Sequence, residues 1–243
     1  MKKIIIPVAV VSLALTVLPS CTGLQEVANQ IGQVSSGGNI GQNQIASALK
    51  QALQQGVDKQ VVKLTKTNGF LGNSLVKIGM PKELQKVEKG LRAAGLGSLA
   101  DEGIKALNRA AENAVKEATP IFVDAITSMT IGDATNILMG NQNAATQYLE
   151  RTTSKSLYGK FNPVIKNSFS KVGADKIWTD LITKYNSIPL VQKVNPDLTD
   201  YVTQQALSGV FTMIEKEELN IRQNVSARST NLLKSVFAMQ DKK

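Results

Sequence analysis

The polar residues of this chain that could do chemistry lie where the apolar faces of its expected helices continue. Apolar residues recur every four positions from Val202 to Ile214, and the same stripe next reaches Glu217 or Glu218. Arg222 follows Glu218 by four residues, a spacing that suits an ion pair on one helix. Paired carboxylates on such a face could act as general acid and base, or bind a divalent metal through oxygen.

A second polar group occurs on an earlier expected helix. Asn108 and Arg109 stand beside apolar neighbours, and Glu112 follows Asn108 by four positions. Arg228 lies just before the last expected helix. These residues extend the candidate set to both halves of the helical region.

The candidate set supports two interpretations. In the first, the residues line a pocket in which Glu112, Glu217 and Glu218 are the acid/base candidates. In the second, a partly buried Arg–Glu network fixes the register of two long helices. The second is favoured, because pairing satisfies both partners and leaves no free base, and no phosphate-binding glycine loop accompanies the network. We therefore assign no catalytic residue.

Residue types that are missing restrict the chemistry further. The 243 residues include no His and only one Cys. Nucleophile activation by histidine and zinc bound through histidine are therefore excluded. No acidic run has the spacing of a calcium loop, and Asp197 and Asp200 are expected in the first turn of a helix. The sequence implies no metal and no cofactor.

The single cysteine, Cys21, stands at the end of an expected export signal. Two lysines precede an apolar run from Ile4 to Leu18, which is too short to be a typical membrane-spanning helix. The run ends in a Leu-Pro-Ser-Cys string that resembles the bacterial lipobox. We expect residues 1–20 to be a lipoprotein signal peptide and Cys21 to carry the lipid that anchors the chain to a membrane.

The residues after Cys21 bear on location. Thr22 stands where Asp would resemble an inner-membrane retention signal, so we expect an outer-membrane lipoprotein that faces the periplasm. The chain is rich in Gly, Ser, Asn and Gln from Gln30 to Gln44, a composition typical of a flexible tether. We place the tether at residues 21–41 and a helical domain at 42–243.

The chain is basic, with a formal charge of +9, and loss of Lys2 and Lys3 with the signal would lower it by two. The remaining basic residues are scattered without a dense run, a pattern typical of a solvated face. We expect no nucleic-acid partner.

From Ile45 onward the apolar spacing is that of helices, and no hairpin or βαβ unit is evident. Turn and cap signals give nine or ten helices, so the fold class is all-α, a single bundle-like domain. Specific expectations are a loop at Phe70–Met80, a helix stop at Gly95, capping boxes at Ser98/Asp101 and Thr130/Asp133, and a new helix at Asn162-Pro163.

Aromatic residues near the middle of the domain offer another candidate pocket. Trp178, Tyr185, Phe169 and Phe161 could line a cavity for an acyl chain, but aromatics at helical spacing more often form core. Gly209 is expected to permit close helix packing rather than ligand approach.

Several strings together resemble a known bacterial family. In order they are Asn68-Gly69-Phe70, Gly95-Leu96-Gly97, Asn108-Arg109-Ala110-Ala111-Glu112, Asp133-Ala134, Ala144-Ala145-Thr146-Gln147-Tyr148, Leu198-Thr199-Asp200-Tyr201-Val202, Glu217-Glu218, Ile221-Arg222 and Arg228. The chain resembles the domain of unknown function 4197 family from about Gln42 to Phe237. The resemblance implies an exported, often lipid-anchored helical protein and no particular activity.

These observations favour a non-catalytic envelope lipoprotein whose helical domain binds a partner, which would be a periplasmic protein, a lipid or a cell-wall polymer. One alternative is a carboxylate-dependent enzyme that acts on a lipid or glycan. Another is a helical lipid carrier with an apolar cavity.

Overall fold

Helices make up all the regular secondary structure in the part of the chain that the structure describes. The computed structural model describes residues 40–171, 179, 183, 186, 189–190, 193, 195 and 197–241. The all-α class is confirmed, although these residues form fewer α-helices than the nine or ten expected. The α-helices are α2 (Gln42–Thr65), α3 (Gln85–Ala93), α4 (Gly97–Ala114), α5 (Ala118–Thr127), α6 (Ile131–Met139), α7 (Ala144–Ser170), α9 (Leu198–Gln223) and α10 (Asn231–Phe237).

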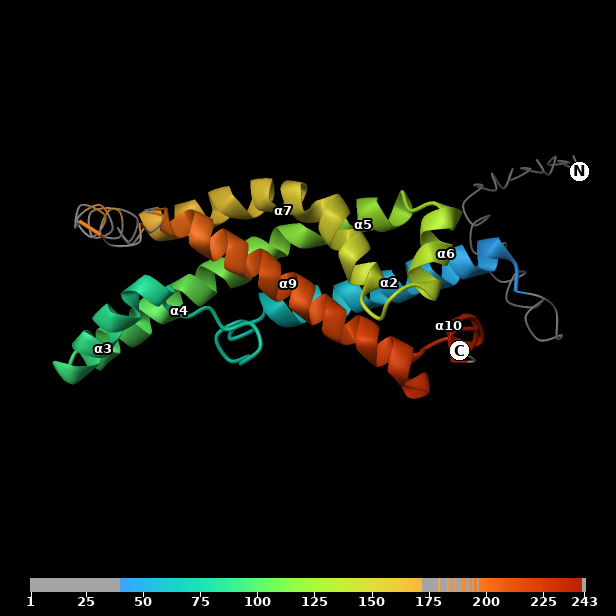
Figure 1. Cartoon of the computed structure of the whole chain (residues 1–243), viewed down its shortest axis with the longest axis horizontal. Helices are drawn as coiled ribbons and strands as arrows, with labels where there is room; N and C mark the ends of the chain where they lie inside the picture. The colour runs from blue at the N-terminus through green and yellow to red at the C-terminus, as the bar shows by residue number, and fades with distance from the viewer. Residues whose placement is uncertain are drawn as a thin grey trace, which may run out of the picture. The chain divides into compact units, whose positions relative to one another are not determined.

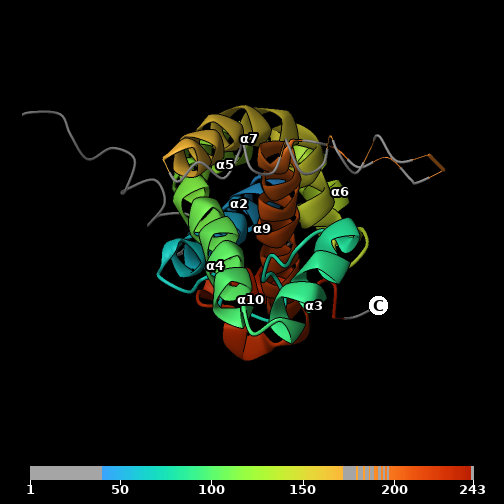
Figure 2. The same cartoon turned by 90° about the vertical axis from the view of Figure 1, so that its left-hand side faces the viewer.

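The longest described helices of the unit Ile40–Lys243 are α2, α4, α7 and α9, whose arrangement Figures 1 and 2 show. Helix α9 packs against α7, α2 and α4, and α2 also contacts α5, α6 and α10. The core between them is almost entirely aliphatic, with a few fully buried rings such as Phe70, Phe122 and Phe161. None of the described helices is both long enough and apolar enough to cross a membrane.

The expected helix start at Asn162-Pro163 is wrong, because α7 runs without interruption through Pro163. Proline in a helix interior removes one backbone hydrogen bond and costs about 3 kcal/mol. Phe161, Ile165 and Phe169 are fully or almost fully buried across this point. Burying each such side chain contributes about 1.5–3 kcal/mol, so the packing of the apolar face offsets the proline.

One predicted capping box forms and the other does not. Thr130 accepts a hydrogen bond from the Asp133 backbone N–H at 3.1 Å, and Asp133 accepts from the Thr130 N–H at 3.0 Å. At the start of α4, however, no side chain caps the helix, and the Asp101 carboxylate accepts from Arg92 at 2.6 Å instead. The expected Ser98 box is wrong, because α4 begins at Gly97 with Leu96 as its N-cap, so Ser98 lies inside the helix.

Two other expectations about helix ends are confirmed. The chain leaves α3 through Gly95, whose φ of +78° is the left-handed conformation that glycine adopts most easily. At the start of α9, the Asp197 side chain accepts from the Asp200 backbone N–H, as expected for a first-turn acid.

The expected loop after α2 is present and enters the core. Phe70 is fully buried, and Ile78 nearly so. A Cβ placed at Gly209 on α9 would lie 2.7 Å from Cε1 of Phe70. Gly209 thus permits close packing as expected, but the neighbour that it admits is a ring from the loop.

Several expectations fall on residues outside the described part of the chain. These are the signal peptide 1–20, lipidation at Cys21, almost all of the tether 21–41, and the aromatic residues Trp178 and Tyr185. Of the aromatic group, Phe161 and Phe169 are described, and both belong to the core.

Candidate functional site

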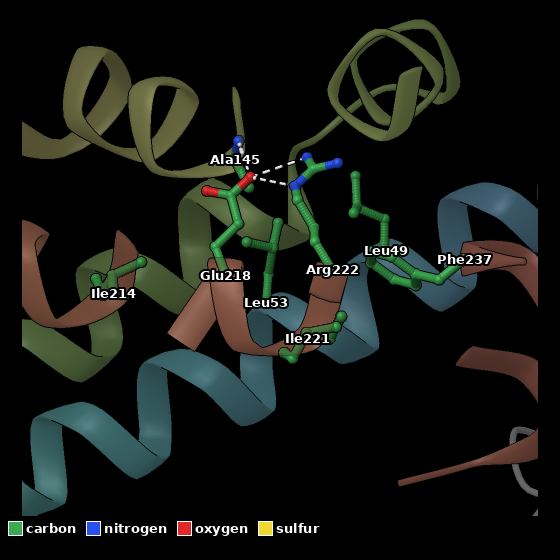
Figure 3. A pocket seen from close by; sticks show the side chains of 9 residues that line it. Leu49, Leu53, Ala145, Ile214, Glu218, Ile221, Arg222 and Phe237 are labelled. Atoms are coloured by element: carbon green, nitrogen blue, oxygen red, sulfur yellow. Dashed lines mark hydrogen bonds and ion pairs between the residues drawn. The ribbon is translucent and has the colours of Figure 1, made fainter. Parts of the chain in front are cut away.

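Glu218 and Arg222 form a buried ion pair on α9, drawn in Figure 3. Their atoms approach to 2.9 Å, and their side chains are 7% and 1% exposed. Glu218 also accepts the backbone N–H groups of Ala145 at 3.0 Å and Thr146 at 2.8 Å. The Thr146 hydroxyl donates to the same carboxylate at 2.8 Å. Glu218 therefore accepts hydrogen bonds from backbone N–H groups in the first turn of α7, which have no partner within that helix.

Arg222 makes the matching contacts at the end of α6. Its guanidinium donates to the carbonyl oxygens of Ile137 at 2.8 Å and Leu138 at 3.2 Å. It also donates to the Gln240 side chain at 2.7 Å. The anion thus lies at the positive end of α7 and the cation at the negative end of α6, so the helix dipoles stabilise both charges.

A small apolar cavity adjoins this pair. Its volume is about 30 Å³, and its walls include Leu49, Leu53 and Phe237 (Figure 3). A water molecule needs about 10–15 Å³ measured in this way, whereas pockets for organic ligands have about 300–1,000 Å³. The cavity accommodates water-sized molecules and does not accommodate an acyl chain or a sugar.

Glu217 faces α2 instead. Its carboxylate accepts from the Lys59 ammonium at 2.6 Å and from the Gln60 amide at 2.8 Å. The Gln60 side-chain oxygen is buried and has no hydrogen-bond partner among the described residues. Although Glu217 and Glu218 are neighbours in sequence, they serve different helix contacts and do not form a carboxylate pair.

The earlier polar group fastens the loop after α2 to α4. Asn108 accepts from the Ile78 backbone N–H at 2.9 Å and donates to the Ile78 carbonyl at 2.8 Å. Glu112 accepts from the Phe70 backbone N–H at 3.2 Å and is paired with Arg109. Arg109 in turn donates to the Asn68 side chain at 2.9 Å. These side chains supply the hydrogen bonds that an irregular buried segment cannot make for itself.

Arg228 closes the C-terminal end of α9. It donates to the carbonyl oxygens of Ile221 at 3.1 Å and Arg222 at 2.8 Å. Two further hydrogen bonds, of 2.6 and 2.8 Å, join it to the Asp241 carboxylate. These bonds from Arg228 hold the pKa of Asp241 below its usual value.

The seven residues singled out from the sequence thus do not form one site. They lie at four different contacts between parts of the fold. Each of the three buried glutamates accepts at least two hydrogen bonds from protein donors. These three carboxylates are therefore held as hydrogen-bond acceptors within the fold.

A larger groove, which sequence reasoning missed, lies between α7 and α9. Its volume is about 310 Å³. Its walls are mostly polar, and their residues are Asn143, Thr146, Gln147, Glu150, Ser154, Gln204, Leu207, Ser208, Phe211, Thr212 and Glu215. The signal was readable, because polar residues recur at helical spacing at 143, 147, 150 and 154, and again at 204, 208 and 212. Exposed polar stripes are so common on helices that neither stripe stood out by itself.

Comparison with known proteins identifies a family whose function is not established. No curated protein and no solved structure matches the chain. One family model matches residues 39–238, and its description is "Protein of unknown function (DUF4197)". The chain therefore belongs to this family of unknown function.

Proposed function

We propose that this protein is a lipid-anchored component of the bacterial cell envelope whose helical domain is a non-catalytic binding module facing the periplasm. The proposal that the module is non-catalytic rests on the hydrogen bonds that Glu112, Glu217 and Glu218 accept from the protein itself. Each is buried and bonded to donors of its own fold, so none resembles the desolvated, unpaired acid of a carboxylate enzyme.

The anchor rests on the sequence alone. A positive start, a short apolar run and a lipobox-like string precede the only cysteine, and Thr22 follows it. Lipid on Cys21 would bring the chain to the outer membrane, where a periplasmic protein, a lipid or a cell-wall polymer is within reach.

The two alternatives each have a structural requirement. A lipid carrier needs an apolar cavity that can hold an acyl chain, and the one beside Arg222 measures only about 30 Å³. A carboxylate-dependent enzyme needs a glutamate that its own fold does not occupy. The binding module needs a surface groove, and the α7–α9 groove supplies one.

Intact mass spectrometry of the protein extracted from membranes tests the anchor. We expect a chain that begins at Cys21 and carries the mass of its acyl chains, and a Cys21→Ala variant that lacks them. A Ser20→Ala variant is the matched control, because alanine is also a small residue and should leave processing intact. An unmodified wild-type Cys21 would contradict the proposal.

A further inference from the structure

The α7–α9 groove presents neutral hydrogen-bonding side chains along both of its walls. Asn143, Gln147 and Ser154 come from the α7 side, and Gln204, Ser208 and Thr212 come from α9. The side chains of Gln204, Ser208 and Thr212 make no hydrogen bond within the described residues, so their donors and acceptors are available to a ligand. The apolar floor is minor, since Leu207 and Phe211 are only 7% and 6% exposed.

The first turn of α7 is held in place beneath this groove. Thr146 lines the groove and also donates its hydroxyl to Glu218, within the buried junction described above. At the same end, Gln147 donates to Asn143 at 3.1 Å and Asn143 donates to Glu215 at 3.3 Å. The groove walls are therefore preorganised, which lowers the entropic cost of binding.

Charge decides which ligands suit this groove. Its only ionisable lining residues are Glu150 and Glu215, and no Lys or Arg is among the described residues that line it. In a chain with a formal charge of +9, this is a locally acidic surface. An anionic polymer or a phosphate group would meet two carboxylates and no cation, so the groove disfavours such ligands.

Hydrogen-bond geometry distinguishes the remaining classes. An extended peptide that adds a strand needs a sheet edge, and the described residues offer no strand. A proline-rich peptide needs an aromatic-lined groove, whereas the one aromatic lining residue here, Phe211, is nearly buried. A helical peptide requires a broad apolar groove, which two nearly buried floor residues do not provide. A sugar chain has hydroxyl groups on many sides. The carboxylates of the groove can accept hydrogen bonds from them, and its amide and hydroxyl side chains can both accept and donate.

We propose that the α7–α9 groove binds a short glycan segment that carries no net negative charge. This deepens the proposed role as a binding module, because it names the class of partner, and it does not depend on the lipid anchor. The volume of about 310 Å³ lies at the small end of the range for ligand pockets, so only a short part of a longer polymer would be held.

Titration of the isotope-labelled full chain, purified in detergent, tests this proposal. The probe is N,N′-diacetylchitobiose, an uncharged disaccharide, and the readout is the side-chain amide signals of Asn143, Gln147 and Gln204 in proton–nitrogen NMR spectra. We expect saturable shifts confined to these signals and their neighbours. Because the sugar carries no charge, the affinity should change little with salt concentration.

A pair of matched variants makes the test specific. Ser208→Leu places a bulky apolar side chain in the groove, and we expect it to weaken sugar binding by about tenfold or more. Ser156→Leu makes the same change at an exposed position of α7 that does not line the groove, and binding should stay unchanged. Circular dichroism of both variants checks that the helices persist.

Three results would overturn the proposal. The first is no shift up to the solubility limit of the sugar, and the second is equal weakening by both variants. The third is a lysine-rich peptide that shifts the same signals more strongly and loses its effect in high salt, which would assign the groove to a basic protein. A finding that Cys21 carries no lipid would refute the anchor and leave the groove result standing.

Discussion

Glu218 and Arg222, one turn apart on α9, hold the beginning of one helix and the end of another. Glu218 accepts the N–H groups of Ala145 and Thr146, while Arg222 donates to the carbonyls of Ile137 and Leu138. The buried pair therefore completes the hydrogen bonding of the α6–α7 connection.

Removing one member of this pair should be strongly destabilising. Glu218→Ala leaves Arg222 buried without its anion and leaves the first N–H groups of α7 without an acceptor. We expect the free energy of unfolding, measured by urea denaturation, to fall by about 3–5 kcal/mol. Glu150→Ala, at an exposed position of α7, should change it by less than about 0.5 kcal/mol. If both variants change the free energy of unfolding by equally small amounts, the buried pair contributes little to stability.

Close packing at Gly209 gives a second prediction. A methyl group there would lie 2.7 Å from the Phe70 ring and 3.3 Å from Cβ of Val76. We expect Gly209→Ala to destabilise the fold by about 1–3 kcal/mol, and Phe70→Leu to restore part of that loss in the double variant. At Gly159, where a Cβ meets nothing within 4 Å, the same substitution should stabilise by about 0.5–1 kcal/mol. Matching effects at the two glycines would contradict this account.

Pro163 tests the continuity of α7. If the helix runs through this position, Pro163→Ala restores a backbone donor to the carbonyl of Gly159 and removes a steric clash. Thermal and urea denaturation should then show stabilisation of about 1–3 kcal/mol. A proline at the first position of a new helix would instead be favourable, and its replacement would be neutral or destabilising.

The pairing of Asp241 with Arg228 predicts a pH dependence. Because the folded-state pKa of Asp241 is lowered by its hydrogen bonds from Arg228, the carboxylate form stabilises the fold. That stability is fully present above the ordinary pKa of 3.8 and is lost as the pH falls through the lower folded-state value. Asp241→Asn should therefore lower Tm at neutral pH, and the difference from the unsubstituted chain should shrink below pH 3.8. A constant difference across this range would refute the ion-pair contribution.

Local patterns predicted the ion pair of Glu218 with Arg222 on α9, but not the contacts that the glutamates make with other helices. The stripe from Val202 led to Glu217 or Glu218, and both are buried. Their partners on other helices are Lys59, Gln60 and the backbone of α7, which are separated from them by many residues. Nothing in the spacing along one helix specifies such contacts.

One error in the fold has the same origin. Asn162-Pro163 has the composition of a helix start, but the packing of Phe161 and Ile165 carries the helix through it. There, tertiary packing outweighed a local signal of about 3 kcal/mol. The other error is local, because α4 begins at Gly97 and so places Ser98 inside the helix, where it cannot act as the N-cap.

If the domain resides in the cell envelope and binds glycan through the α7–α9 groove, photocrosslinking in intact cells should capture that glycan. A photoreactive amino acid replaces Ser208 in the groove or, as the control, Ser156 outside it. We expect high-molecular-mass adducts from position 208 only, and lysozyme digestion should reduce them to the mass of the chain with a short sugar remnant. Adducts of discrete size that resist lysozyme and yield to protease, or equal adducts from both positions, would contradict it.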